Sequence, residues 1–169
     1  MKYFSPLLIF ILGWILLLVS NSLAFIGLTN GLLQLLLFFF VVCIPTWLTQ
    51  RMSYVDIGWP WGLVLIGIVT LLLSEGDSAR VIVVSVAYIF AGGRMGVGAL
   101  KMWKAGMLKR ELPRYEYQKH RWITAGKTNV KLIMQVEVVL QGLANASFLA
   151  MPALVIATNP GGPVTVLEV

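Results

Sequence analysis

Residues Arg80 to Leu100 read RVIVVSVAYIFAGGRMGVGAL, and a basic segment begins directly after them at Lys101. This run is long enough to cross a bilayer as a helix, which needs about 20 mainly apolar residues. Its apolar and polar residues do not alternate with the period of two that a membrane strand requires. The stretch therefore predicts a transmembrane helix.

Further apolar runs share this character and lie at about residues 6–26, 29–48, 60–74 and 130–157. Together with residues 80–100 they predict an all-α, polytopic transmembrane bundle of about five spans. Tight turns are expected at Thr29-Asn30-Gly31 and at Ser74-Glu75-Gly76-Asp77. Pro60 is expected at the start of the third helix, where its missing N–H costs nothing.

The composition supports a membrane protein, because 59% of the residues are hydrophobic, 12% are charged and the mean hydropathy is +0.86. Soluble domains use about 45–50% apolar and 25% charged residues. The length of 169 residues suits one compact bundle, so we predict a single membrane domain over residues 1–169. Cys43 is the only cysteine, which excludes an intramolecular disulfide and suggests no thiolate metal site.

The net charge of +6 is concentrated in one segment. Nine of the thirteen basic residues lie between Lys101 and Lys131, where the only acids are Glu111 and Glu116. The positive-inside rule therefore predicts a cytoplasmic basic loop over residues 101–130, a cytoplasmic N-terminus and an external C-terminus. We predict an integral protein of a cytoplasmic (inner) membrane or of the endoplasmic-reticulum type. The lipid bilayer is its expected partner, and nucleic acid is not.

Two ionisable residues lie inside predicted spans, where such groups are costly and default to functional hypotheses. Arg94 and Glu137 are each about six residues from the inner end of their helices, so they share a depth. One interpretation is an ion pair that neutralises both charges. The other assigns Glu137 to catalysis as a buried acid with a raised pKa.

Polar side chains recur every four residues along the last predicted helix, at Glu137, Gln141 and Asn145. This spacing places them in one stripe about 12 Å long. The stripe can act as hydrogen-bonding glue between helices. Alternatively, it can line a polar cavity in which Gln141 and Asn145 bind a substrate. Both interpretations stay open at the level of sequence.

The segment Ser53-Tyr54-Val55-Asp56-Ile57-Gly58-Trp59 offers a second set of candidates. Ser53 or Asp56 can cap the following helix by accepting hydrogen bonds from its free N–H groups. A functional interpretation makes Tyr54 and Asp56 proton donors or orienting groups at the cytoplasmic mouth.

The basic loop interleaves guanidinium groups with aromatic rings, including Arg114, Tyr115 and Arg121. Arginine matches phosphate and rings stack on a base, so this pattern suits a nucleotide, although a lipid-binding strip has similar composition. His120 has no neighbour at metal-ligand spacing and is expected in solvent. Gly92 and Gly96 lie inside an apolar span, which favours helix packing over a dinucleotide motif.

Taken in order, four motifs resemble the DUF1295 branch of the steroid 5-alpha-reductase-like membrane family. They are Ser53 to Trp59, Gly93-Arg94-Met95, Leu112-Pro113-Arg114-Tyr115 with Arg121-Trp122, and Leu140-Gln141-Gly142 with Pro152. The resemblance covers about residues 45–155. It implies a multi-helix bundle that binds NADPH on the cytoplasmic side. It also implies hydride transfer to a carbon-carbon double bond conjugated to a carbonyl, in a lipid-soluble substrate.

The resemblance implies functional roles for six residues of this chain: Asp56, Arg94, Arg114, Tyr115, Arg121 and Gln141. Combined with the candidates above, it gives one predicted set of site residues without a metal. The predicted catalytic residues are Asp56, Tyr54 and Glu137; the cofactor-binding residues are Arg94, Arg114, Tyr115 and Arg121; the substrate-binding residues are Gln141 and Asn145.

The sequence departs from the family pattern at two places. Gly98 stands where the family usually has a His, four positions after Arg94. The family also continues into further helices with an Arg-His-Pro-Asn-Tyr type motif, so the chain is expected to be the N-terminal part of a longer family domain. The alternatives are a membrane S-adenosylmethionine-dependent methyltransferase, because related lipid methyltransferases share a similar C-terminal signature, and a non-enzymatic packing protein.

Overall fold

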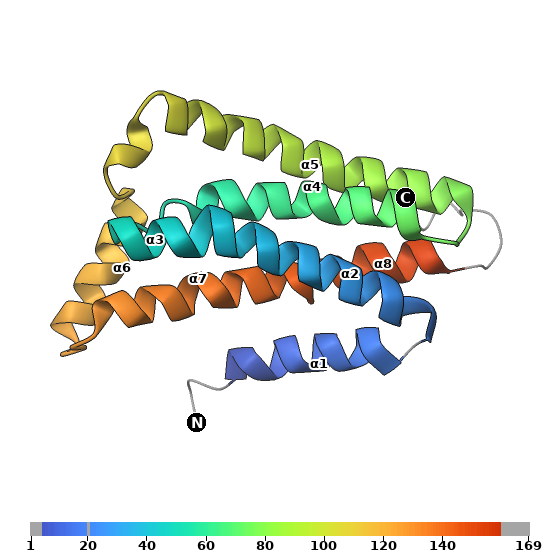
Figure 1. The fold of residues 1–169 in the computed structure, drawn as a ribbon, viewed down its shortest axis with the longest axis horizontal. Helices are drawn as coiled ribbons and strands as arrows, with labels where there is room; N and C mark the ends of the chain where they lie inside the picture. The colour runs from blue at the N-terminus through green and yellow to red at the C-terminus, as the bar shows by residue number, and fades with distance from the viewer. Residues whose placement is uncertain (1–4, 20, 160–169) are drawn as a thin grey trace.

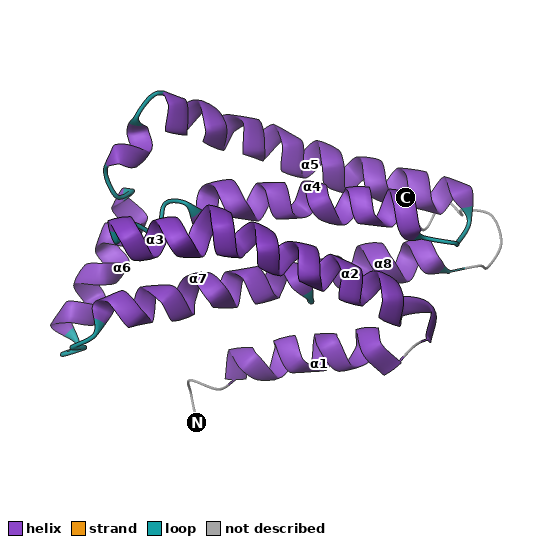
Figure 2. Cartoon of the chain, viewed as in Figure 1, coloured by secondary structure: helices purple, strands orange, loops and turns teal. Residues whose placement is uncertain are grey.

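The computed structural model describes residues 5–19 and 21–159, and every regular element in those ranges is a helix (Figure 2). The elements are α1 (Ser5–Val19), α2 (Asn21–Phe38), the π-helical turn η1 (Phe39–Cys43), α3 (Ile44–Thr49), α4 (Val55–Leu73), α5 (Ser78–Lys104), the 3-10 turn η2 (Met107–Lys109), α6 (Pro113–Thr124), α7 (Val130–Ala146) and α8 (Ala150–Thr158). The predicted all-α class is confirmed.

Four helical runs are long and apolar enough to cross a membrane: Leu23–Thr49, Val55–Leu73, Ser78–Lys104 and Val130–Thr158. The first joins α2, η1 and α3, and the last joins α7 to α8. A shorter apolar helix, Phe10–Val19, precedes them. The protein is therefore a polytopic helix bundle, as the five apolar runs predicted.

Helix α4 lies at the centre of the bundle and packs on α2, α5, α7 and α8. Its contact with α5 is the most extensive in the fold, and α5 forms one edge of the bundle (Figure 1). Gly92 makes this closeness possible, because a Cβ there would lie 2.5 Å from the Pro60 carbonyl oxygen. A Cβ at Gly96 would lie 2.9 Å from Trp61 Nε1, so the ring of Trp61 occupies the space that a side chain there would need. The predicted packing role of both glycines is confirmed.

Neutral amides join the helices in the interior. Asn30, Gln34 and Asn145 are all fully buried. Gln34 Nε2 donates to the Gly62 carbonyl at 2.8 Å, and Asn145 Nδ2 donates to the Trp59 carbonyl at 3.1 Å. These bonds tie α2 and α7 to α4 without a charge. The last span bends where α7 ends, and there Tyr88 donates to the Leu149 carbonyl at 2.8 Å.

Three predicted boundaries are wrong. No turn forms at Thr29-Asn30-Gly31, because these residues lie inside α2. Asn30 donates to the Ala146 carbonyl, and Gly31 faces the ring of Trp14. These residue types are common in turns, but here they make contacts between helices. The turn at Ser74 to Asp77 does form, and the Asp77 side chain caps α5.

Pro60 is not the first residue of its helix, since α4 begins at Val55 and contains it.

The basic segment, predicted as a loop over residues 101–130, contains helical structure. Helix α5 extends to Lys104, and α6 occupies residues 113–124. We call the end of the bundle that carries η2 and α6 the basic end.

Candidate functional site

A cavity of about 630 Å³ opens at the basic end of the bundle. Its wall comes from the first turns of α4, the last turns of α5, the start of α6 and one residue of α7. The lining residues are Val55, Asp56, Trp59, Pro60, Met95, Gly98, Ala99, Met102, Arg114, Tyr115 and Gln141. Four of the predicted site residues, Asp56, Arg114, Tyr115 and Gln141, therefore meet at one cavity.

The polar end of the cavity is a cluster of Asp56, Tyr115 and Arg114. The Tyr115 hydroxyl donates to Asp56 Oδ1 at 2.8 Å, and Arg114 Nη2 forms an ion pair with the same oxygen. The Arg114 guanidinium also lies 4.9 Å from the centroid of the Tyr115 ring. Pro113 begins α6 at the position that suits proline, which places Arg114 and Tyr115 in its first turn, opposite the first turn of α4.

Burial raises the pKa of the Tyr115 phenol, and the neighbouring Asp56 carboxylate raises it further. Tyr115 is therefore protonated at neutral pH and acts as a hydrogen-bond donor. The other partner, Asp56, accepts this hydrogen bond and the Arg114 ion pair through the same oxygen. The cluster thus combines a neutral donor, a carboxylate and a guanidinium whose side chain is 63% exposed.

Glu111 positions this cluster, and sequence reasoning treated it only as one of two acids in a basic segment. Its carboxylate is 5% exposed and accepts from Met52 N at 2.8 Å, from Ser53 N at 3.0 Å and from the Ser53 hydroxyl. Lys119 Nζ pairs with it at 2.8 Å. The sequence does contain a signal that could have identified Glu111, because this acid lies among basic residues directly before Leu112-Pro113.

Glu111 and Ser53 together form a clamp between two loops that are almost sixty residues apart. The Ser53 hydroxyl also accepts from Leu112 N at 3.0 Å, directly before α6. Burial alone would raise the pKa of Glu111, but hydrogen bonds from Lys119, Ser53 and Met52 and the Lys119 charge outweigh it and lower that pKa. We call Ser53, Glu111 and Lys119 the clamp.

Neither Ser53 nor Asp56 caps α4, because α4 has no side-chain cap.

The polar stripe on α7 divides between the two roles that its spacing left open. Gln141 lines the cavity. Asn145 instead packs against Gly62 and bonds to Trp59, so it is interhelical glue and does not line this cavity. Glu137 is half-buried, one turn before Gln141, and is not part of the cavity lining.

Three other predicted residues lie apart from the cavity. Tyr54 faces a different hollow, and its hydroxyl accepts from Arg51 Nη2 at 3.2 Å. Arg94 is exposed on α5, and Arg121 is exposed on α6. None of the three is a lining residue of the cavity.

The suggested direct ion pair between Arg94 and Glu137 is wrong, since neither residue forms an ion pair in the part of the chain that the structure describes. Helix α5 packs chiefly on α4, whereas α7 packs on α2 and α4, so α4 separates the two helices (Figure 1). Equal predicted depth says nothing about the lateral distance between the two side chains. That distance depends on the order of the helices around α4.

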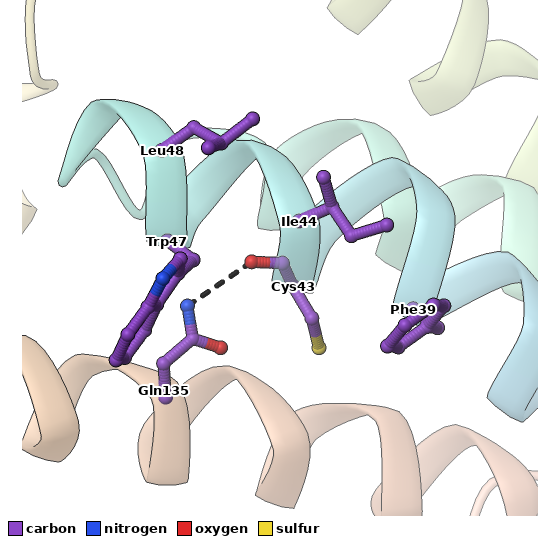
Figure 3. Close-up of a pocket in the computed structure, with 6 residues that line it drawn as sticks. All are labelled: Phe39, Cys43, Ile44, Trp47, Leu48 and Gln135. Carbon is purple, nitrogen blue, oxygen red and sulfur yellow. Dashed lines mark hydrogen bonds between the residues drawn. The ribbon is translucent and has the colours of Figure 1, made fainter.

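A smaller hollow of about 290 Å³ lies between α3 and α7 (Figure 3). Phe39, Ile44 and Trp47 supply part of its apolar wall. Gln135 Nε2 donates to the Cys43 carbonyl at 3.0 Å, and this bond ties α7 to the π-helical turn. Within residues 5–19 and 21–159, no three His, Cys, Asp or Glu side chains gather as metal ligands.

Comparison with known families finds a match over most of the chain. The family model described as "Protein of unknown function (DUF1295)" matches residues 38–169, which include all the cavity residues. No curated protein and no solved structure matches the chain.

Proposed function

We propose that this chain, which belongs to the DUF1295 family, contributes the site of a membrane reductase that uses NADPH. The proposed substrate is a lipid-soluble molecule with a carbon-carbon double bond conjugated to a carbonyl. The observation that carries the proposal is the Tyr115–Asp56–Arg114 cluster at one end of a cavity whose other walls are largely apolar. A neutral phenol beside a carboxylate suits the carbonyl end of such a substrate.

The donor set of the cavity fits part of a dinucleotide. Arg114 is 63% exposed and lies in the first turn of α6, where the helix dipole favours phosphate. Trp59 and Tyr115 offer rings against which a flat group can stack. Arg114 and these rings would therefore hold the cofactor. Arg94 and Arg121, which lie outside the cavity, take no part in the proposal.

When bound, NADPH supplies the hydride that the β-carbon of the substrate accepts. Tyr115 then donates its hydrogen bond to the carbonyl oxygen, where negative charge develops as the double bond is reduced. The phenol has one proton, so the hydrogen bond to Asp56 is exchanged for one to the substrate carbonyl, while Arg114 holds the Asp56 carboxylate beside the phenol. Gln141 faces the same cavity from α7 and provides a further amide for substrate orientation. The proton that completes the reduction at the α-carbon comes from solvent.

The first test is a titration of the full chain in detergent with NADPH and, separately, with S-adenosylmethionine. Binding of NADPH is expected, and exclusive binding of S-adenosylmethionine would support the methyltransferase instead. Arg114→Ala should weaken NADPH binding about tenfold, since a charge-assisted contact contributes about 1.5–3 kcal/mol. Lys127→Ala removes one charge from the exposed far end of the same segment and should leave the affinity unchanged.

Tyr115→Phe tests the proposed donor. It removes the hydroxyl but keeps the ring and the Arg114–Asp56 pair, so NADPH affinity should be retained while turnover of an enone falls about a hundredfold. Loss of NADPH oxidation is followed at 340 nm, a standard wavelength for the reduced cofactor. Unchanged turnover in Tyr115→Phe would remove Tyr115 from the mechanism.

A further inference from the structure

A second cavity, of about 420 Å³, lies on the opposite side of the α4–α5 pair from the candidate site. Helix α4 contributes Asp56, Trp59 and Pro60 to the first cavity but Ile57 and Trp61 to this one. Its remaining wall includes Val41 from η1 and Leu100 and Trp103 from α5. The two cavities therefore share no lining residue, although both open near the basic end.

The lining of this second cavity is apolar except at one end. Tyr54 is the one lining residue with a hydroxyl, and Arg51 donates to it at 3.2 Å. The Arg51 guanidinium lies 5.7 Å from the centroid of the Tyr54 ring and also donates to the Leu108 carbonyl at 2.7 Å. In the part of the chain that the structure describes, no carboxylate pairs with Arg51. Among these described residues, its positive charge is therefore not neutralised by a carboxylate.

A second cation stands at the same end. Lys104 follows Leu100 by one helical turn, on the same face of α5 and nearer the basic end. Its side chain is exposed. An apolar hollow among membrane-spanning helices, with uncompensated cations at its head-group end, complements a molecule with an apolar tail and an anionic head.

We propose that this cavity binds an anionic phospholipid, with one acyl chain between Val41, Trp61 and Trp103 and the phosphate near Arg51, Tyr54 and Lys104. The Tyr54 hydroxyl donates to no group among the described residues, so its proton is available to a phosphate oxygen. Tyr54 thus acquires a ligand-binding role, separate from the catalytic role that its sequence neighbours suggested. The site is independent of the proposed reductase activity.

The test uses the full chain reconstituted in phosphatidylcholine vesicles that contain increasing fractions of phosphatidylglycerol with brominated acyl chains. Bromine quenches nearby tryptophans, and Trp61 and Trp103 line the cavity. Half-maximal quenching is expected at a several-fold lower lipid fraction for brominated phosphatidylglycerol than for brominated phosphatidylcholine. Trp61→Phe combined with Trp103→Phe should remove this excess quenching. Equal midpoints for the two lipids would overturn the proposal.

Two variants locate the effect. Lys104→Gln should shift the phosphatidylglycerol midpoint about fivefold, as expected for one basic residue near an anionic head group. Lys131→Gln is the matched control, because Lys131 Nζ lies 3.8 Å from the Trp47 ring on the α3–α7 side, and it should leave the midpoint unchanged. Equal shifts in both variants would indicate general surface charge and overturn the site.

Val41→Phe should fill the part of the cavity that holds the acyl chain and so remove the excess quenching by phosphatidylglycerol. If Val41→Phe does not fold, the result for Lys104→Gln still decides the test.

Discussion

The basic end and the middle of the bundle are held together by different chemistry. At the basic end, charged groups bridge distant segments, as in the clamp of Ser53, Glu111 and Lys119 and in the pair of Asp56 with Arg114. In the middle, neutral amides of Asn30, Gln34 and Asn145 join the helices. The difference follows from the solvent, because a charge in hydrocarbon is costly whereas a neutral amide that donates to a backbone carbonyl is tolerated.

This comparison also separates function from packing. The charged end borders the candidate cavity, where exposed donors can meet a ligand. In the middle, the amide nitrogens of Gln34 and Asn145 donate to backbone carbonyls. Packing there leaves no room for a ligand, since a Cβ on Gly62 would lie 2.1 Å from Asn145 Nδ2. A polar residue inside a span is therefore not by itself a site.

The largest effect is expected for Glu111→Ala. This change leaves Met52 N, Ser53 N and Lys119 without their shared acceptor, and breaking a buried charged pair costs about 3 kcal/mol. The free energy of unfolding, measured by titration with dodecyl sulfate in mixed micelles, should fall by that amount. Glu116→Ala is the control, because Glu116 is exposed on α6 and should change stability by about 0.5 kcal/mol or less.

The clamp also predicts a pH dependence. The pKa of Glu111 is lowered in the folded protein, so its contribution is complete above the unfolded value of about 4.3. That contribution is lost as the pH falls through the folded pKa. The stability difference between the wild type and Glu111→Gln should therefore be constant from pH 5 to 8 and shrink below pH 4. A difference that changes across neutral pH would contradict the assigned ionisation.

Gly62→Ala probes the middle of the bundle. The added methyl would collide with Asn145 Nδ2 and lie 2.8 Å from Gln34 Oε1. Overpacking of this kind costs about 2 kcal/mol. The matched control is Gly93→Ala, because a Cβ at Gly93 meets nothing within 4 Å. Thermal unfolding in detergent compares the two, and equal stabilities would mean that the amide contact with Gly62 is loose.

Asn145→Ala should have a smaller effect, of about 1 kcal/mol. It removes one interhelical hydrogen bond to the Trp59 carbonyl, and such bonds in membranes contribute about 0.6–1.7 kcal/mol. The same unfolding titration measures it. A loss as large as that of Glu111→Ala would erase the contrast between the two regions.

The smallest effect is expected for the coupling between Arg94 and Glu137. Because the structure shows no direct ion pair between them, Arg94→Leu and Glu137→Leu should be additive to within about 0.5 kcal/mol. A double-mutant cycle measures this coupling. A value above 1 kcal/mol would restore the pair that equal depth suggested.

The positions of most spans followed from sequence because each helix needs only its own run of apolar residues. The first predicted span, residues 6–26, is an exception, since α1 ends at Val19 and α2 begins at Asn21. Residues 80–100 predicted most of α5, and the charge pattern located the basic end. Boundaries failed where tertiary contacts override local preference. Asn30 and Gly31 resemble a turn, yet α2 continues through them because Ala146 and Trp14 provide partners.

The sequence alone determined the helical class, most of the spans, the family and the residue types gathered at the basic end. Only the tertiary structure decided which of those residues meet. The position of a residue along its apolar run predicts how deep its side chain lies, but the direction of the side chain depends on helix rotation and on which helices surround α4. Asp56 and Tyr115 are 59 residues apart and share a hydrogen bond, whereas Arg94 and Glu137, which the sequence predicted to share a depth, form no ion pair with each other.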